Sequence, residues 1–178
     1  MTPSTPLTPT PVKGKTVFVA MDESLSSANS LKWALKNCLN DGDLCVVLSV
    51  VERKEDEYPR RERMNSLLSV IREPYSKGIR FSLRVISSDD VGFAIVEQTT
   101  RHHPSSLVLS HSLHSSLIGV SSYLYPEPQY AQTHSPLVSY LLENVPPSVP
   151  VLTVRYIPPE QVEDGADRRK KAESVWDL

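Results

Sequence analysis

Five short apolar runs divide the middle of the chain, and each has the length of a β-strand. The run at residues 17–20, Val-Phe-Val-Ala, is continuously apolar, which is typical of a central strand covered on both faces. The run at 44–51 is longer and rich in β-branched residues. Residues 80–86 alternate enough between apolar and polar positions for a third strand, and runs at 107–110 and 150–156 complete the set, so the pattern predicts five strands.

Apolar residues at spacings of three and four lie between these runs and predict helices. After the first strand, one helical stripe carries Ala28, Leu31, Leu35, Cys38 and Leu39. Serines at 24–27 offer N-cap oxygens for this helix, and Gly42 offers its end. After the second strand, residues 52–63 predict a charged turn. This turn leads into a helix that Pro74 limits and that faces inward through Met64, Leu67, Leu68 and Ile71.

Two further helices follow the third and fourth strands. Residues 89–103 predict a helix capped by Asp89 or Asp90, and its inward-facing candidates are Phe93, Val96 and Ile95. Residues 135–145 predict the last helix. Strands that alternate with helices require right-handed crossovers. We therefore expect an α/β fold: an open five-stranded, mostly parallel sheet with helices on both faces.

The chain divides into one folded domain and two tails. Residues 1–14 form a Thr/Pro tract that cannot bury enough apolar surface to fold, so we expect a disordered arm. Its four Thr-Pro pairs are either sites for proline-directed kinases or the composition of a spacer. Residues 15–156 form the domain, and 157–178 form a charged tail. The basic cluster at 168–171 is either an anionic-surface or nuclear signal or, in the favoured interpretation, one face of a solvated helix.

Composition narrows the class of protein. The formal net charge is −2 and the pI is about 6.2, which gives no general attraction to nucleic acid or to an anionic membrane. No segment approaches the roughly 18 apolar residues of a membrane span, and residues 1–11 lack the apolar core of a secretory signal. The two cysteines, Cys38 and Cys45, indicate neither a disulfide framework nor a zinc site. We expect an intracellular protein, cytoplasmic with a nuclear location also open, that binds neither nucleic acid nor membrane.

Five segments in register resemble the universal stress protein family, within the adenine nucleotide α-hydrolase-like superfamily, over about residues 15–156. They are TVFVAMDES with Asp22 and Ser24, SLKWAL, LSVVE, SSLVLSHS and SPLVSYLLENVPPSVPVLTVR. The resemblance implies an open five-stranded parallel sheet and, in many members, ATP or AMP bound at the carboxyl ends of the strands. Open α/β sheets hold ligands there because the loops diverge and helix N-termini point their amides into the crevice.

The resemblance also implies a ligand crevice, whose candidate residues are Asp22, Val50, Ser110, Ser112 and Ser135. Asp22 would bond a ribose or a base edge, and the backbone around Val50 would meet an adenine. The alternative role for Asp22 is to cap the first helix. No resident cofactor is expected, and ATP and AMP are the candidate ligands.

The phosphate loop departs from the family pattern G-x2-G-x9-G-[S/T]. Ser110 and Leu113 occupy the first two glycine positions, and Ser135 with Pro136 occupies the third pair. Glycines let backbone N–H groups approach phosphate oxygens, and Pro136 has no N–H at all. We therefore do not expect a standard triphosphate cradle.

An insertion at about residues 114–134 replaces the family's shorter loop. Its tyrosines, Tyr123, Tyr125 and Tyr130, make it a candidate for contact with a protein partner or for a lid over the crevice. The alternative is a surface loop with no task.

All five histidines lie in one third of the chain: His102, His103, His111, His114 and His134. His111 and His114, three residues apart, suggest a metal site, but zinc needs three or four ligands and no cysteine or acidic pair is near in sequence. We expect no metal site; contact with a phosphate, pH sensing and plain surface positions are the alternatives. The sequence has no nucleophile elbow, H-E-x-x-H or P-loop, so we assign no catalytic residue.

These observations favour a universal stress protein-like binding or regulatory module with a degenerate ATP loop, and not an enzyme. It would act in a stress response through a partner at the tyrosine-rich insertion and through homodimerisation along the last strand, Val151 to Arg155. Pairing is expected there because an unpaired apolar edge strand is liable to aggregate. The alternatives are an ATP- or AMP-binding sensor, and a phosphoester or nucleotide hydrolase with His111 or His114 as general base.

Overall fold

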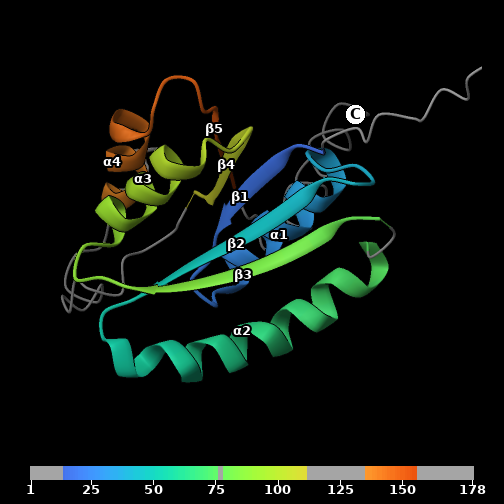
Figure 1. Ribbon diagram of the computed structural model, residues 1–178, viewed down its shortest axis with the longest axis horizontal. Helices are drawn as coiled ribbons and strands as arrows, with labels where there is room; N and C mark the ends of the chain where they lie inside the picture. The colour runs from blue at the N-terminus through green and yellow to red at the C-terminus, as the bar shows by residue number, and fades with distance from the viewer. Residues whose placement is uncertain (1–13, 76–77, 112–134, 156–178) are drawn as a thin grey trace, which may run out of the picture.

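Strands and helices alternate along residues 14–75, 78–111 and 135–155, the part of the chain that the computed structural model describes (Figure 1). The strands are β1 (Thr16–Ala20), β2 (Leu44–Val51), β3 (Arg80–Ser87), β4 (Ser106–Ser110) and β5 (Val151–Val154). The helices are α1 (Leu25–Asn37), α2 (Glu57–Arg72), α3 (Val91–His102) and α4 (Pro136–Asn144), with short 3-10 turns η1 (Lys54–Asp56) and η2 (Glu73–Tyr75) flanking α2. Among these described helices, none is long and apolar enough to cross a membrane. The predicted arm up to residue 13, the insertion and the charged tail lie outside the described residues.

The five strands form one sheet in the order β3-β2-β1-β4-β5, and every described pair is parallel. In the central strand, Val19 pairs with Val47 of β2 and with Val108 of β4. The strand order reverses between β1 and β4, and open α/β sheets bind ligands at such a reversal. The prediction of a five-stranded parallel α/β sheet is confirmed.

Each face of the sheet is covered by a pair of helices, α1 and α2 on one side and α3 and α4 on the other (Figure 1). Successive strand residues point to opposite faces. Val17 therefore packs with Leu31 and Met64 under α1 and α2, whereas Phe18 packs with Leu141 on the other face. This double coverage explains why the central strands are continuously apolar.

Short polar side chains begin three of the helices. Ser24 is the N-cap of α1, and its Oγ accepts a hydrogen bond from the backbone N–H of Ser27 at 3.1 Å. Asp90 caps α3 in the same way, with the N–H of Phe93 at 2.8 Å, and Ser135 caps α4. The serine and aspartate caps predicted for the first and third helices are confirmed.

Helix α2 begins earlier than predicted. The charged segment 52–63 predicts a turn, but residues 57–63 are helical. Pro59 is compatible with this because it stands in the first turn, where a backbone N–H has no intrahelical acceptor. The glutamate and arginine residues around it are good helix formers. The longer helix presents Arg60 and Arg63 to the edge of the sheet.

Phe93 is 57% exposed, so the prediction that it faces inward is wrong. The buried side of α3 runs through Ala94 and Ile95 to Gln98, and Val96 is half-buried. The four apolar residues at 93–96 follow one another directly, so spacing cannot show which of them faces the sheet. The packing of α3 against the sheet makes that choice.

Candidate functional site

The carboxyl ends of three neighbouring strands bring three of the candidate residues to one edge of the sheet. Val50 is near the end of β2, Asp22 follows β1, and Ser110 ends β4. The backbone N–H of Met21 donates to the carbonyl of Leu48 at 2.8 Å, which places Asp22 level with Val50. This is the edge at which parallel α/β sheets hold their ligands.

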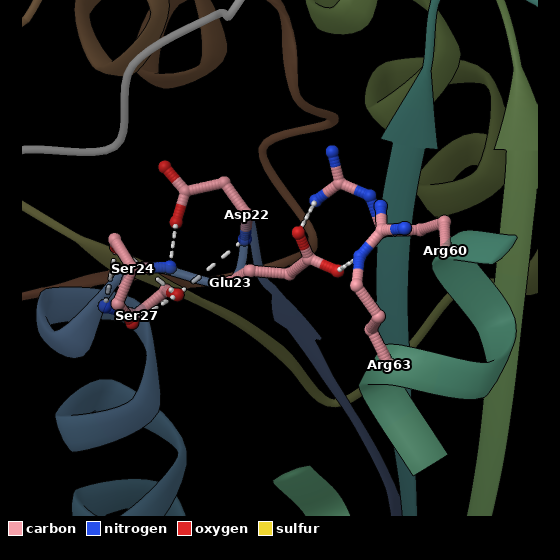
Figure 2. A network of polar contacts seen from close by, with 6 residues as sticks. All are labelled: Asp22, Glu23, Ser24, Ser27, Arg60 and Arg63. Atoms are coloured by element: carbon pink, nitrogen blue, oxygen red, sulfur yellow. Dashed lines mark hydrogen bonds and ion pairs between the residues drawn. The ribbon is translucent and has the colours of Figure 1, made fainter. Parts of the chain in front are cut away.

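Asp22 lies in the turn between β1 and α1. Its Oδ1 accepts a hydrogen bond from the backbone N–H of Ser24 at 3.1 Å, and its own N–H donates to Ser27 Oγ at 3.4 Å (Figure 2). Because Ser24 is the N-cap, the alternative in which Asp22 itself caps α1 is wrong. Asp22 instead orders the turn before the cap, as aspartate does in Asx turns. Its Oδ2 forms no hydrogen bond within the described residues.

Ser110 occupies the first position of the predicted phosphate loop, and its side chain is enclosed. The residue is completely buried, and its hydroxyl forms a short contact with the hydroxyl of Ser26 in the first turn of α1. The next backbone N–H, that of His111, donates to the carbonyl of Val154 in β5 at 2.9 Å. A glycine at position 110 would leave space beside the start of α1, whereas the serine pair fills it.

The other three candidates differ in their surroundings. Val50 is half-buried at the end of β2. Ser135 caps α4, with its Oγ accepting from the N–H of Val138 at 3.3 Å, so its hydroxyl has a structural task. Ser112 lies outside the described residues. The structure therefore groups Asp22, Val50 and Ser110 on adjacent strand ends.

Glu23 connects the β1–α1 turn to α2 through two ion pairs. Its Oε1 is 2.9 Å from Arg63 Nε, and its Oε2 is 3.3 Å from Arg60 Nη1 (Figure 2). Glu23 has a φ of 68°, in the left-handed region, which costs a non-glycine residue about 1 kcal/mol or more. The ion-pair cluster of Glu23, Arg60 and Arg63 thus holds a strained residue at the ligand edge.

Sequence analysis missed these three residues. Arg60 and Arg63 belong to the segment that predicts a turn, where a spacing of three carries no meaning. In a helix the same spacing puts both side chains on one face. The available signal was an acidic residue directly after the first strand and two arginines shortly after the second.

A pocket of about 260 Å³ lies beside the ion-pair cluster. The end of β2 and the start of α2 form most of it, and its lining is Val50, Val51, Glu52, Asp56, Arg60, Arg63 and Val91. Nε and Nη1 of Arg60 are buried and have no hydrogen-bond acceptor among the described residues. Glu23 Oε2 lies 3.3 Å from Nη1, which makes an ion pair but not a hydrogen bond. A buried donor without an acceptor is costly, and a ligand oxygen would remove that cost.

The described histidines lie at opposite ends of the sheet. His111 follows β4 at the carboxyl edge, whereas His102 and His103 end α3 before β4 begins. Partial burial, together with the charges of Arg84 and Arg101, lowers the pKa of His102, whose Nε2 contacts Arg84 Nη1. Within the described ranges, no three His, Cys, Asp or Glu side chains are grouped to hold a metal.

Comparison with solved structures identifies the fold. Universal stress protein UspA from Lactobacillus plantarum is 12% identical, with a TM-score of 0.56, and the match covers 80% of this chain and 99% of that one. A universal stress protein from Archaeoglobus fulgidus in complex with dAMP is 14% identical, with a TM-score of 0.52 and coverage of 79% and 96%. A universal stress protein in complex with cAMP is 15% identical, with a TM-score of 0.51 and coverage of 80% and 98%.

No protein-family model matches the sequence, and no curated protein sequence matches it significantly. The similarity is therefore carried by the arrangement of strands and helices. The chain has the universal stress protein fold, as the resemblance predicts.

Proposed function

We propose that this chain is a universal stress protein-type binding module, not an enzyme, that lacks the triphosphate cradle and acts in a stress response through contacts with other protein chains. The proposal rests on the surroundings of Ser110, which stands at the first glycine position of the phosphate loop. The buried Ser110 hydroxyl is paired with Ser26, and the His111 amide is bonded to Val154. Groups that a phosphate would need at this point are engaged inside the protein.

Homodimerisation through β5 is part of this proposal. β5 is an edge strand that pairs with β4, and all its side chains are half-buried in the single chain. A half-covered apolar edge is suited to pairing with a second copy. The tyrosine-rich insertion at 114–134, outside the described residues, stays the predicted contact for a different protein partner.

A mononucleotide sensor is the second candidate function, and the positions of Asp22 and Val50 favour it. Both lie at the carboxyl edge, and Asp22 Oδ2, which has no hydrogen-bond partner among the described residues, is the candidate acceptor for a ribose hydroxyl or a base edge. Two solved structures of the same fold hold dAMP and cAMP. A ligand with one phosphate depends less on loop amides than ATP does.

Thermal unfolding with nucleotides separates the two functions. The full chain is melted with ATP, ADP or AMP, with and without Mg²⁺. A ligand that binds only the folded state stabilises it by about 2.7 kcal/mol at one hundred times its Kd. Our proposal predicts no rise in Tm at millimolar nucleotide.

The variants decide what a rise would mean. A rise with AMP that Asp22→Ala abolishes and the exposed control Asp89→Ala retains would establish a nucleotide sensor. A rise with ATP would refute the loss of the triphosphate cradle.

A further inference from the structure

Arg60 and Arg63 of α2, which both pair with Glu23 (Figure 2), line a pocket that shares only Val50 with the candidate nucleotide residues. The Arg60 side chain is only 14% exposed, and its buried Nε and Nη1 have no hydrogen-bond acceptor in the part of the chain that the structure describes. A guanidinium group carries its donors in a planar fork that matches a phosphate or carboxylate. Part of the Arg60 fork is therefore unused.

Glu23 is the internal anion that occupies the arginine pair. It offers one oxygen to each arginine, at 3.3 Å for Arg60 and 2.9 Å for Arg63, and it does so with a left-handed backbone. Its side chain is 29% exposed, so the carboxylate has a direct route to solvent. A better acceptor at the arginines would let Glu23 turn outward.

The other residues of the lining indicate which groups the ligand carries besides its anionic group. Val50, Val51 and Val91 form an apolar wall, and Glu52 and Asp56 add two carboxylates. These acids disfavour a bare polyanion but accept hydrogen bonds from hydroxyl groups. A volume of about 260 Å³ is also below the roughly 300–1,000 Å³ of drug-sized sites, which argues against a whole nucleoside triphosphate.

We propose that this pocket binds a small phosphorylated polyol, of the sugar phosphate class. The phosphate displaces the Glu23 carboxylate from Arg60 and Arg63, and the hydroxyl groups donate to Glu52 and Asp56. The site does not depend on the function proposed above, although Val50 belongs both to its lining and to the candidate nucleotide crevice. Asp22 is not part of its lining, and its carboxylate points away from the arginines toward Ser24 (Figure 2).

Isothermal titration of the full chain with ribose 5-phosphate tests the proposal, with ribose and inorganic phosphate as probes that each lack half of the ligand. Ribose 5-phosphate is expected to bind at least about tenfold more tightly than either probe, because a charge-assisted hydrogen bond corresponds to about that factor. Equal affinity for inorganic phosphate would overturn the polyol assignment.

Charge-neutralising variants locate the ligand. Arg60→Gln and Arg63→Gln are expected to weaken binding at least about tenfold. The matched control is Arg61→Gln, on the same helix turn, whose side chain bonds the carbonyl of Leu83 instead. It should change affinity less than about twofold, within the small effect of an exposed charge. Equal losses in Arg60→Gln and Arg61→Gln would contradict the site.

Glu23→Gln removes the competing charge and is expected to tighten binding, whereas the exposed control Glu62→Gln leaves it unchanged. Glu23→Gly, which suits the left-handed backbone, serves if circular dichroism shows that Glu23→Gln does not fold. Absence of binding to both the natural chain and a folded Glu23 variant would overturn the proposal. Asp22→Ala should retain the ligand, and its loss there would place the ligand in the nucleotide crevice and refute this pocket.

Discussion

Asp43 lies just before β2 and is 6% exposed. Its Oδ1 accepts a hydrogen bond from the backbone N–H of Lys15 at 2.9 Å, and its Oδ2 accepts one from the N–H of Asn40 at 2.8 Å. The ammonium group of Lys15 is 3.9 Å away on a side chain that is 42% exposed, so the ion pair contributes less than about 1 kcal/mol. The two hydrogen bonds therefore contribute more to stability than the ion pair does at the amino-terminal end of β2.

Asp43→Ala is expected to lower the free energy of unfolding by about 2 to 4 kcal/mol, because two backbone N–H groups lose their acceptor. Lys15→Ala is the matched control, since it removes the ion pair and keeps both backbone donors. It should cost less than about 1 kcal/mol. Urea unfolding measures both values, and similar losses in the two variants would show that the ion pair matters more than we infer.

Among the strands and helices, β5 is the element through which we propose that two copies of the chain dimerise. The carbonyls of Pro150 and Val154 accept hydrogen bonds from Leu107 and His111, so alternate residues of β5 direct their backbone groups to β4. Thr153 belongs to the other set of alternate residues, so its N–H and C=O point away from β4, to the free edge that no described strand covers. An edge with free backbone groups is a template for another strand.

Thr153→Pro removes one N–H from this free edge and leaves the hydrogen bonds to β4 in place. We expect the dimer to become a monomer in light scattering coupled to size-exclusion chromatography. Thr153→Val keeps both the N–H and the branched shape, and should stay dimeric. A natural chain that is monomeric, or a dimer that survives Thr153→Pro, would contradict pairing through β5.

At the scale of the whole molecule, the two cysteines report on different kinds of opening. Cys45 is completely buried in β2, and this burial raises its pKa to about 12. Cys38 follows α1 and is half-buried; burial raises its pKa, and the charge of Lys15 opposes that rise. Because the thiolate is the reactive form, Cys45 is protected in two ways: reagents cannot reach it, and its thiol stays protonated.

A thiol reagent at neutral pH is therefore expected to label Cys38 first and Cys45 only through opening of the sheet. Mass spectrometry should show one label per chain under native conditions, and the second label should appear at a rate set by the unfolding equilibrium. In Cys38→Ser, only the slow reaction should be left. Equal labelling rates for the two cysteines would mean that β2 opens locally.

The order and type of the elements follow from patterns of neighbouring residues in the sequence. Apolar runs predicted β1 and β2, and helical spacing predicted α1, because periodicity and capping are properties of neighbouring residues. Together with the family resemblance, the sequence also predicted that Asp22, Val50 and Ser110 share one edge, since parallel strands end on the same side. The start of α2 was missed because Pro59 suits both a turn and a first helical turn.

The surroundings of that edge depend on contacts between residues that are far apart in the sequence. Glu23 and Arg63 are 40 residues apart, and Ser26 and Ser110 are 84 apart. They meet because β1 lies between β2 and β4, with α1 and α2 on the same face. Such contacts depend on the packing of whole elements, and no local pattern in the chain records them.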